Sequence, residues 1–343
     1  MSKIKIGISI GDLNGIGIET IIKTFKDNRM MDFCTPIIFG SQKVASIHRK
    51  AIKIADFSFN VINNIKDANP KRANLLNICK EDIDVIFGEE TNKSAEVSFN
   101  ALKKASNALK NNEIDALVTA PINKSAIQKN IPNFIGHTEF LQEKFEGESL
   151  MIMASEKMKI AFVTGHIPLT EVEKSIETEN IILKTKQLNT SLIQDFGIRM
   201  PKIAILGLNP HAGENGLIGK EEEKYILPAI KTLKKEGIMA FGPYPADSFF
   251  TNKNLENFDG ILSMYHDQGL TAFKTLSFSD GVNFTARLNI IRTSPVHGTA
   301  YEIAGEGIAN EKSFREAVFM ACDIHKNRSE FNLLNKNPLP YKS

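Results

Sequence analysis

Short apolar runs rich in β-branched residues alternate with amphipathic helical stretches along the chain. The strand-like runs lie at residues 5–10, 35–39, 116–120, 159–163, 202–206, 260–264 and 281–285. Apolar residues spaced for one helix face predict helices over residues 17–25, 42–52, 95–109, 176–189, 221–236 and 312–326, with Pro228 kinking or interrupting the fifth of them. This alternation predicts an α/β fold with a mostly parallel or mixed sheet. Because no low-complexity linker divides the chain, we expect any second domain to be an insertion.

Composition narrows the class of protein. The 343 residues are 42% hydrophobic and 24% charged, which is typical of a globular protein with one large or two medium domains. Basic and acidic residues nearly balance, 42 against 40, so we expect no nucleic-acid partner. No apolar run reaches the ~20 residues that span a bilayer, and the first residues carry no signal-peptide core, so we expect no membrane partner. Three widely spaced cysteines, Cys34, Cys79 and Cys322, favour reduced thiols in a cytoplasmic protein.

Histidines in loops are the first candidates for chemistry. His166, His211 and His266 each follow a strand-like run, so all three are predicted to project from one edge of a sheet. Three imidazoles with an open fourth position make a catalytic metal site, and they suit zinc, cobalt or nickel better than magnesium. The alternative is that they are hydrogen-bonded loop histidines.

Four other features could carry function, and the first three of them also allow a purely structural interpretation. The glycine loop at residues 11–17 could bind an anion at a helix N-terminus or form a tight turn. In the segment 136–140, Thr138 could be a helix N-cap, or His137 and Thr138 could hold a polar substrate group. Arg292, one of only eight arginines beside 34 lysines, suits a phosphate or carboxylate but equally an ion pair. The loop at residues 297–310 could wrap a flat ligand such as adenine.

Together these segments resemble the 4-hydroxythreonine-4-phosphate dehydrogenase family of pyridoxal phosphate biosynthesis. The resemblance runs in order from residue 6 to about residue 310. The matching pieces are Gly11-Asp12 with Gly15-Ile-Gly17 and Glu19, Thr119-Ala-Pro-Ile-Asn-Lys124, Gly136-His-Thr-Glu-Phe-Leu141, Thr164-Gly-His166, Leu208-Asn-Pro-His-Ala-Gly-Glu214, Gly242-Pro-Tyr-Pro-Ala-Asp247, Tyr265-His-Asp-Gln-Gly269, Val282-Asn283, Ile291-Arg-Thr-Ser294 and His297-Gly-Thr-Ala300. The last piece also resembles the adenine-binding loop of isopropylmalate dehydrogenase.

The resemblance implies a two-lobed α/β/α fold like that of isocitrate and isopropylmalate dehydrogenases, with the active site in the interdomain cleft. We expect a cofactor-side domain at residues 1–130 and 275–343 and a metal, substrate and dimerisation domain at residues 131–274. A homodimer is implied, with active sites shared between subunits and metal ligands coming from both.

Site residues follow from the matching motifs. His166, His211 and His266 resemble the metal ligands, and together with Lys274 they form the expected catalytic set. The substrate-binding set is His137, Thr138, Lys274, Asn283 and Arg292, and the cofactor-binding set is His297, Gly298, Thr299, Glu302 and Asn310. The expected cofactors are a divalent metal ion (zinc, cobalt or magnesium) and NAD or NADP, with NAD favoured.

Three departures from the family pattern affect the loops. Asp12-Leu-Asn-Gly15 stands where the family has Asp-Pro-Ala-Gly, and Ala286-Arg-Leu-Asn289 stands for Leu-Gly-Leu-Pro. Val296 replaces the aspartate that usually precedes His-Gly-Thr. None of these changes removes a metal or substrate match.

The implied reaction is NAD(P)-linked oxidation of the 3-hydroxyl of 4-phosphohydroxy-L-threonine, followed by decarboxylation to 3-amino-2-oxopropyl phosphate. One alternative is a related dehydrogenase acting on another phosphorylated hydroxy acid, a phosphothreonate or phosphoerythronate. The other is a non-enzymatic binding protein that keeps the cleft, which the presence of all three histidines disfavours.

Overall fold

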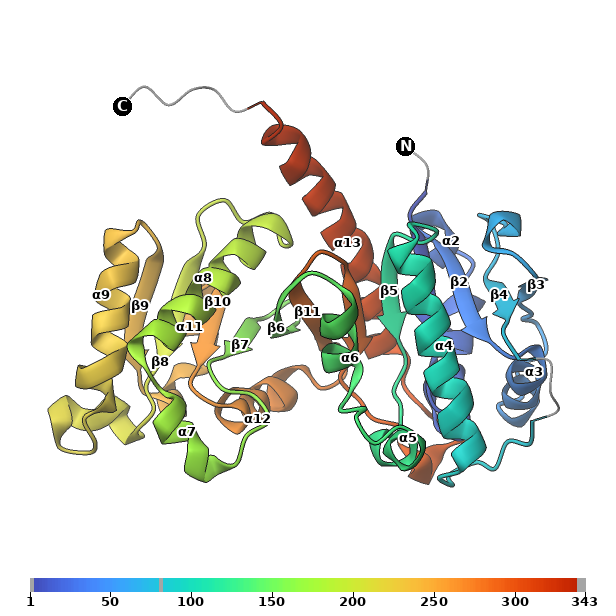
Figure 1. Ribbon diagram of the computed structural model, residues 1–343, viewed down its shortest axis with the longest axis horizontal. Coiled ribbons are helices and arrows are strands. Elements are labelled where there is room, and N and C mark those ends of the chain that lie inside the picture. The colour runs from blue at the N-terminus through green and yellow to red at the C-terminus, as the bar shows by residue number, and fades with distance from the viewer. Residues whose placement is uncertain (1–2, 80–82, 338–343) are drawn as a thin grey trace. The chain divides into compact units, whose positions relative to one another are not determined.

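The computed structural model describes residues 3–79 and 83–337, and the chain divides into two compact units (Figure 1). Unit 1 comprises Met1–Ser149 and Leu288–His325, and unit 2 comprises Leu150–Arg287 and Lys326–Ser343. The sequence analysis placed its boundaries near residues 130 and 275. The ends of its predicted cofactor-side domain, residues 1–2 and 338–343, lie outside the described ranges.

Unit 1 is built on parallel strands in the order β3-β4-β2-β1-β5-β12. Its strands are β1 (Lys5–Ser9), β2 (Thr35–Gly40), β3 (Asn60–Ile62), β4 (Asn74–Asn77), β5 (Ala116–Thr119) and β12 (Arg292–Pro295). Its helices are α1 (Gly17–Lys26), α2 (Met30–Phe33), α3 (Gln42–Ala51), η1 (Ile65–Asp67), α4 (Asn92–Lys110), α5 (Lys124–Asn130), α6 (His137–Lys144), η4 (Tyr301–Ile303) and the part of α13 (Lys312–Leu334) that ends at His325.

Helix α4 covers β1, β2 and β5 with the apolar face that the sequence predicted (Figure 1). Val97 and Leu102 are buried on that face. Phe99 is half-buried and instead packs edge-on against Phe134 and Phe140, with ring centroids 5.5 Å apart in each pair. This aromatic cluster fixes the start of α6, where two of the predicted substrate-binding residues lie.

Unit 2 carries strands in the order β11-β6-β7-β10-β8-β9, of which β7, β10, β8 and β9 pair in parallel and β6 runs antiparallel to β7. Its strands are β6 (Gly147–Ala154), β7 (Lys159–Phe162), β8 (Lys202–Leu206), β9 (Met239–Tyr244), β10 (Gly260–Ser263) and β11 (Val282–Leu288). Its helices are α7 (Leu169–Ser175), α8 (Thr178–Gln194), η2 (Pro210–Gly216), η3 (Glu222–Ile226), α9 (Leu227–Lys235), α10 (Ala246–Phe249), α11 (Asn252–Asn257) and α12 (His266–Ser277).

The helix expected at residues 221–236 is interrupted, as its proline predicted. A π-helical turn at Glu222–Ile226 precedes α9, and Pro228, which has no N–H to donate, lies in the first turn of α9. The sequence pattern missed β3, β4, β6, β9 and β12. The pattern identifies strands by their apolar runs, and β12 has none, because its residues Arg292, Thr293 and Ser294 are polar although all three are buried.

Every helix in the ranges 3–79 and 83–337 is too short or too polar to cross a lipid bilayer.

Candidate active site

Three neighbouring parallel strands of unit 2 each end in a histidine loop. The sheet order β7-β10-β8 places the carboxyl ends of these strands side by side. His166 follows β7, His266 follows β10 and His211 follows β8. The topology therefore brings the three loops to one sheet edge, where the sequence analysis expected them.

His166 and His266 lie in direct contact. Their ring centroids are 5.1 Å apart and the rings are tilted by 47°. His266 Nδ1 lies 2.6 Å from Asp267 Oδ1, a contact that favours the tautomer with a proton on Nδ1 and leaves Nε2 as a ligand nitrogen. A Cβ atom added at Gly165 would meet no atom within 4 Å, so the space beside His166 is open.

His211 lies in a loop with an uncommon backbone. Residues 211–215 all have positive φ, between +42° and +79°, and only one of them, Gly213, is a glycine. The left-handed conformation costs an L-residue about 1–2 kcal/mol, so surrounding contacts must hold this turn. The His211 side chain itself is exposed.

These three imidazoles are the right chemistry for a divalent metal. Two of them already touch, one is oriented by a carboxylate, and the third belongs to the adjacent strand's loop. In the described part of the chain, no three or more His, Cys, Asp or Glu side chains already surround a common point that could hold a metal ion. Imidazole nitrogens favour zinc or cobalt over magnesium.

A hollow of about 480 Å³ lies beside α12. Tyr265 and Gln268, which flank His266 in the sequence, line it together with Asp247 and Phe250 from the α10 region. Its volume is in the range of small-molecule sites. The Gln268 side chain also joins two of the histidine loops, because its Nε2 donates to Gly207 O at 2.7 Å and its Oε1 accepts from Met264 N at 2.7 Å.

Two further predicted residues of unit 2 flank this region in the sequence. Lys274 is exposed in the last turn of α12, the helix that His266 begins. Asn283 lies on β11, and its Oδ1 is buried with no hydrogen-bond partner among the described residues. A buried acceptor of this kind is available to a donor group of a bound substrate.

Unit 1 carries a buried cationic cluster around Arg292. Arg292 is 3% exposed, and its Nε and Nη2 donate to Thr119 Oγ1 at 3.1 and 2.7 Å. Burial lowers the pKa of Arg292 to about 10, against the opposing attraction of Glu139. Burial also lowers the pKa of His137 well below its usual value, and the charges of Arg292 and Lys124 lower it further. The cluster is therefore suited to an anion.

His137 presents an unused nitrogen in this cluster. Its Nε2 is buried and, within the residues described, lacks a hydrogen-bond partner. Lys124 completes the positive charge, since its Nζ would lie 3.1 Å from a Cβ atom placed on Gly136. Lys124 was not among the predicted site residues, although its motif, Thr119 to Lys124, was the signal that could have found it.

The N-cap interpretation of Thr138 is wrong. Helix α6 begins at His137, and its N-cap is Gly136, whose extended backbone (φ 169°) leaves no role for the Thr138 hydroxyl in capping. The helix therefore starts two residues earlier than a Thr138 cap implies, and Gly136 lies close to Glu139 and Lys124, whose atoms would be within 3.1 Å of a Cβ there. The substrate-binding role of Thr138 stays a prediction.

The glycine loop at residues 11–17 supports the predicted cofactor loop rather than opening toward a ligand. A Cβ on Gly11 would lie 2.3 Å from Pro121 O, and one on Gly15 would lie 2.7 Å from Thr299 O. Ile16 N donates to the same Thr299 carbonyl at 3.0 Å. Its glycines therefore serve a tight turn that lets two backbones approach.

Side chains fasten the rest of that cofactor loop to the first loop and helix. Tyr301 donates to Asp12 Oδ2 at 2.9 Å, and burial together with this carboxylate raises the pKa of Tyr301. Buried Glu19 accepts from Ala309 N at 2.9 Å, and Lys23 donates to the Gly307 and Ala309 carbonyls at 2.9 and 2.6 Å. The loop is therefore anchored at both its beginning and its end.

The anchored loop still presents groups for a ligand. His297 Nε2 is buried, and no described residue hydrogen-bonds to it, while burial lowers the pKa of His297. A Cβ on Gly298 would meet nothing within 4 Å, and Glu302 and Asn310 are exposed. Thr299 uses its carbonyl to hold Ile16. The five predicted cofactor residues thus share one loop of unit 1.

His48 contacts the same glycine loop, at residue Leu13. Because His48 is titratable and buried, we expect the stability of the protein to depend on pH. The buried ring contacts Leu13 O through Nε2 at 2.7 Å, and burial lowers its pKa to about 4. Between about pH 6.5 and pH 4, His48 is protonated in the unfolded chain but neutral in the folded chain. The free energy of unfolding therefore decreases as the pH is lowered through this range. The slope from one such group approaches about 1.4 kcal/mol per pH unit.

His48→Gln removes the titrating group and keeps a donor. We expect the urea midpoint of this variant to fall less steeply than that of wild type between pH 6.5 and 4.5. His325→Gln, a histidine change on α13, serves as the control. Parallel profiles for His48→Gln and wild type would refute the assignment.

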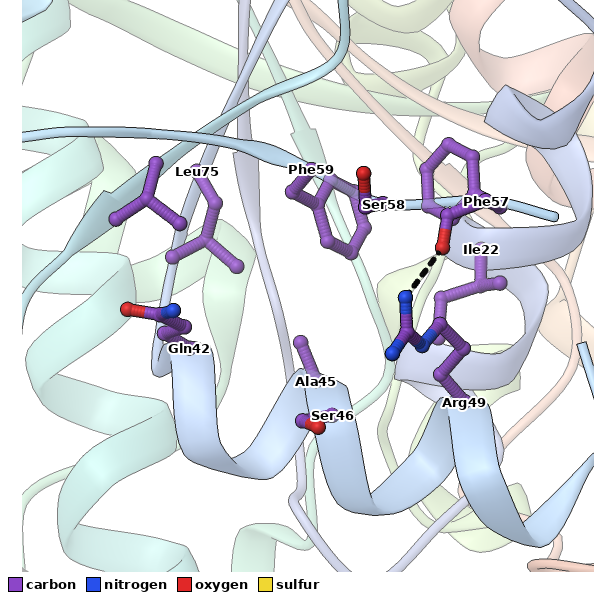
Figure 2. Close-up of a pocket in the computed structure, with 10 residues that line it drawn as sticks. Ile22, Gln42, Ala45, Ser46, Arg49, Phe57, Ser58, Phe59 and Leu75 are labelled. Carbon is purple, nitrogen blue, oxygen red and sulfur yellow. Dashed lines mark hydrogen bonds between the residues drawn. The ribbon is translucent and has the colours of Figure 1, made fainter. Parts of the chain in front are cut away.

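A separate apolar cavity of about 120 Å³ lies in unit 1 between α1, α3 and the strand region of β3 and β4 (Figure 2). Arg49 Nη1 donates to Phe57 O at 2.8 Å at its edge, and Ile22, Phe59 and Leu75 line it. None of the predicted site residues lines this cavity.

Comparison with known proteins places the chain in a family. The family model described as pyridoxal phosphate biosynthetic protein PdxA matches residues 32–321. A 4-hydroxythreonine-4-phosphate dehydrogenase from Bacteroides thetaiotaomicron is 46% identical over 340 residues, covering 98% of this chain and 93% of the relative. A provisionally named D-threonate 4-phosphate dehydrogenase from Oceanobacillus iheyensis is 39% identical over 326 residues, covering 93% of this chain and 97% of the relative.

Solved structures agree with the sequence relatives. The 4-hydroxythreonine-4-phosphate dehydrogenase from Klebsiella pneumoniae matches with a TM-score of 0.79 and 30% identity, covering 95% of this chain and 98% of that one. The enzyme of the same name from Burkholderia phymatum matches with a TM-score of 0.76 and 31% identity, covering 94% of this chain and 99% of that one. The chain therefore has the isocitrate/isopropylmalate dehydrogenase-like fold and belongs to the PdxA family of pyridoxal phosphate biosynthetic proteins.

Proposed function

We propose that this chain is an oxidoreductase that oxidises 4-phosphohydroxy-L-threonine at its 3-hydroxyl with NAD or NADP and decarboxylates the product to 3-amino-2-oxopropyl phosphate. The reaction would serve the biosynthesis of pyridoxal 5′-phosphate, in line with the family. The observation that carries the proposal is the set of three histidine loops at one sheet edge, of which two rings already touch. The 46% identical relative carries the name of this enzyme.

The histidines of the three loops would hold the metal, and Arg292, Lys124 and Lys274 would meet the substrate's negative charges. Asp267 keeps the His266 ring oriented, and Gln268 ties the loops after β10 and β8 together. Arg292, with Lys124 and His137 beside it, would bind one anionic group of the substrate, and Lys274 would offset the other. The partnerless Oδ1 of Asn283 would accept a hydrogen bond from substrate.

Bound metal would lower the pKa of the substrate hydroxyl and stabilise negative charge on its oxygen, while the nicotinamide would accept the hydride. In the oxidation, the alcohol loses a hydride and a proton and becomes a ketone. In the decarboxylation, the resulting β-keto acid loses carbon dioxide and gains a proton on carbon. Lys274 is the candidate for holding a proton near the reacting carbons. Homodimeric assembly with shared active sites and a cytoplasmic location are part of the same proposal.

A second candidate substrate has a specific observation in its favour. The relative from Oceanobacillus iheyensis, 39% identical, is named for D-threonate 4-phosphate. That compound is also a phosphorylated hydroxy acid, with a hydroxyl where phosphohydroxythreonine has its ammonium group. Initial rates with the two compounds, followed by NADH absorbance, separate the proposals.

Glu302 is the residue that we expect to set cofactor choice. Its carboxylate is exposed on the anchored loop, where it can accept hydrogen bonds from the ribose hydroxyls of NAD and repel the 2′-phosphate of NADP. We expect kcat/KM to favour NAD by about 10-fold or more, which needs only about 1.4 kcal/mol. Glu302→Gln should reduce that ratio, whereas Glu306→Gln, an exposed carboxylate on the same loop, should preserve it. Equal wild-type values, or a ratio unchanged in Glu302→Gln, would disprove the role.

A further inference from the structure

We propose that Glu222 is a positioning residue that locks the His211 loop in its left-handed turn and so presents the imidazole to the metal. The proposal rests on the proposed function, because it takes His211 as a metal ligand. Glu222 lies on the π-helical turn before α9, outside the predicted site, and its side chain is buried. A buried carboxylate needs a full set of donors, so its partners show what it does.

The Glu222 carboxylate accepts hydrogen bonds from the start of the histidine loop. Oε1 accepts hydrogen bonds from the backbone N–H groups of Leu208 and Asn209 at 2.8 and 2.7 Å. Oε2 accepts from the Asn209 side-chain Nδ2 at 2.9 Å. These three bonds fix the two residues that lead into Pro210 and His211.

The loop also closes around the carboxylate. A Cβ on Gly213 would lie 2.6 Å from Glu222 Oε2, and a Cβ on Gly207 would lie 3.2 Å from Oε1. Glycines therefore stand on both sides of His211 where the backbone passes the carboxylate. Because residues 211–215 all adopt the left-handed conformation, the turn depends on such outside contacts.

An ionised carboxylate suits this set of donors best, because both of its oxygens accept and its charge strengthens each hydrogen bond. Oε1 and Oε2 face three N–H donors, and an ionised carboxylate is acceptor-only. Glutamine has the same shape but turns one oxygen into an NH₂ group, which would oppose a donor. Glu222→Gln therefore loosens the loop with little change of volume.

The test compares Glu222→Gln with Glu223→Gln, the same change at the exposed next residue. Hydrogen exchange of the 208–216 amides is measured on metal-free protein, and Co²⁺ is then titrated while its visible absorption is recorded. We expect exchange at Leu208 and Asn209 to be about 10-fold faster in Glu222→Gln. We expect Co²⁺ affinity to fall by about 10–100-fold, with an altered cobalt spectrum. Glu223→Gln, whose carboxylate lies beside Gly216 at the far end of the loop, should match wild type in the exchange of Leu208 and Asn209 and in both cobalt readouts.

Other outcomes would contradict the positioning role of Glu222. Unchanged exchange, or faster exchange with wild-type Co²⁺ affinity and spectrum, would overturn the role of Glu222. Wild-type protein that binds no Co²⁺ would overturn the proposed function and the positioning role, while the exchange data would still report whether the anchor exists. If Glu222→Gln does not fold, Gly213→Ala, which pushes a methyl group against the carboxylate, should reproduce the loss of Co²⁺ affinity, and wild-type affinity there would contradict the proposal.

Discussion

Replacing His211 by alanine is expected to lower kcat/KM by about 1,000-fold or more, because losing one of three metal ligands forfeits several kcal/mol of charge stabilisation. The side chain is exposed, so the fold should survive the change. Metal content measured on purified protein should fall together with activity. His325→Ala, a histidine on α13 outside the three loops, should retain both.

An active His211→Ala enzyme with a full complement of metal would remove His211 from the ligand set. An inactive variant that still binds metal tightly would instead give His211 a role in substrate binding. The two results separate because metal content and rate are measured on the same samples.

Replacing Arg292 by glutamine is expected to raise the substrate KM by about 100-fold or more, because hydrogen bonds to a charged group contribute about 1.5–3 kcal/mol each. Arg292 is buried and already directed by Thr119, so it is preorganised for an anion. Arg292→Lys keeps the charge without the planar fork and should recover only part of the affinity.

Thr119→Val provides a milder perturbation of the same group. It removes the hydroxyl that accepts from Nε and Nη2 but leaves the guanidinium in place, so we expect a KM increase of about 10-fold. A substrate KM unaffected by Arg292→Gln in folded protein would rule out the anion-binding role. Thermal unfolding of each variant distinguishes that result from a stability effect.

Much of the framework could be predicted from the sequence because its signals are local. Buried parallel strands such as 116–119 and 202–206 each contain a continuous apolar run, and the residues that follow them reach the same sheet edge. That rule was enough to bring the loops of His166, His211 and His266 together. Pro228 marked the break before α9 because proline restricts the backbone locally.

The rest depends on contacts between residues distant in the chain. The Thr138 N-cap was wrong because the helix begins at His137 after Gly136, where the side chains of Lys124 and Glu139 leave little room for a Cβ, and no local pattern records that crowding. The left-handed turn at His211 has mostly non-glycine residues, so no glycine signal announces it. In the sequence Glu222 is one of three consecutive glutamates, and nothing in that run indicates a buried side chain. In the structure its carboxylate is buried against the loop.

The central claim is metal-dependent oxidation of 4-phosphohydroxy-L-threonine, and one measurement tests it most directly. Protein treated with a chelator and then reconstituted with zinc or cobalt is assayed for NADH formation with 4-phosphohydroxy-L-threonine and, in parallel, with D-threonate 4-phosphate. We predict no turnover after chelation, restored turnover after reconstitution, and a higher kcat/KM for 4-phosphohydroxy-L-threonine. Full activity in the metal-free protein, or turnover of D-threonate 4-phosphate alone, would contradict the account.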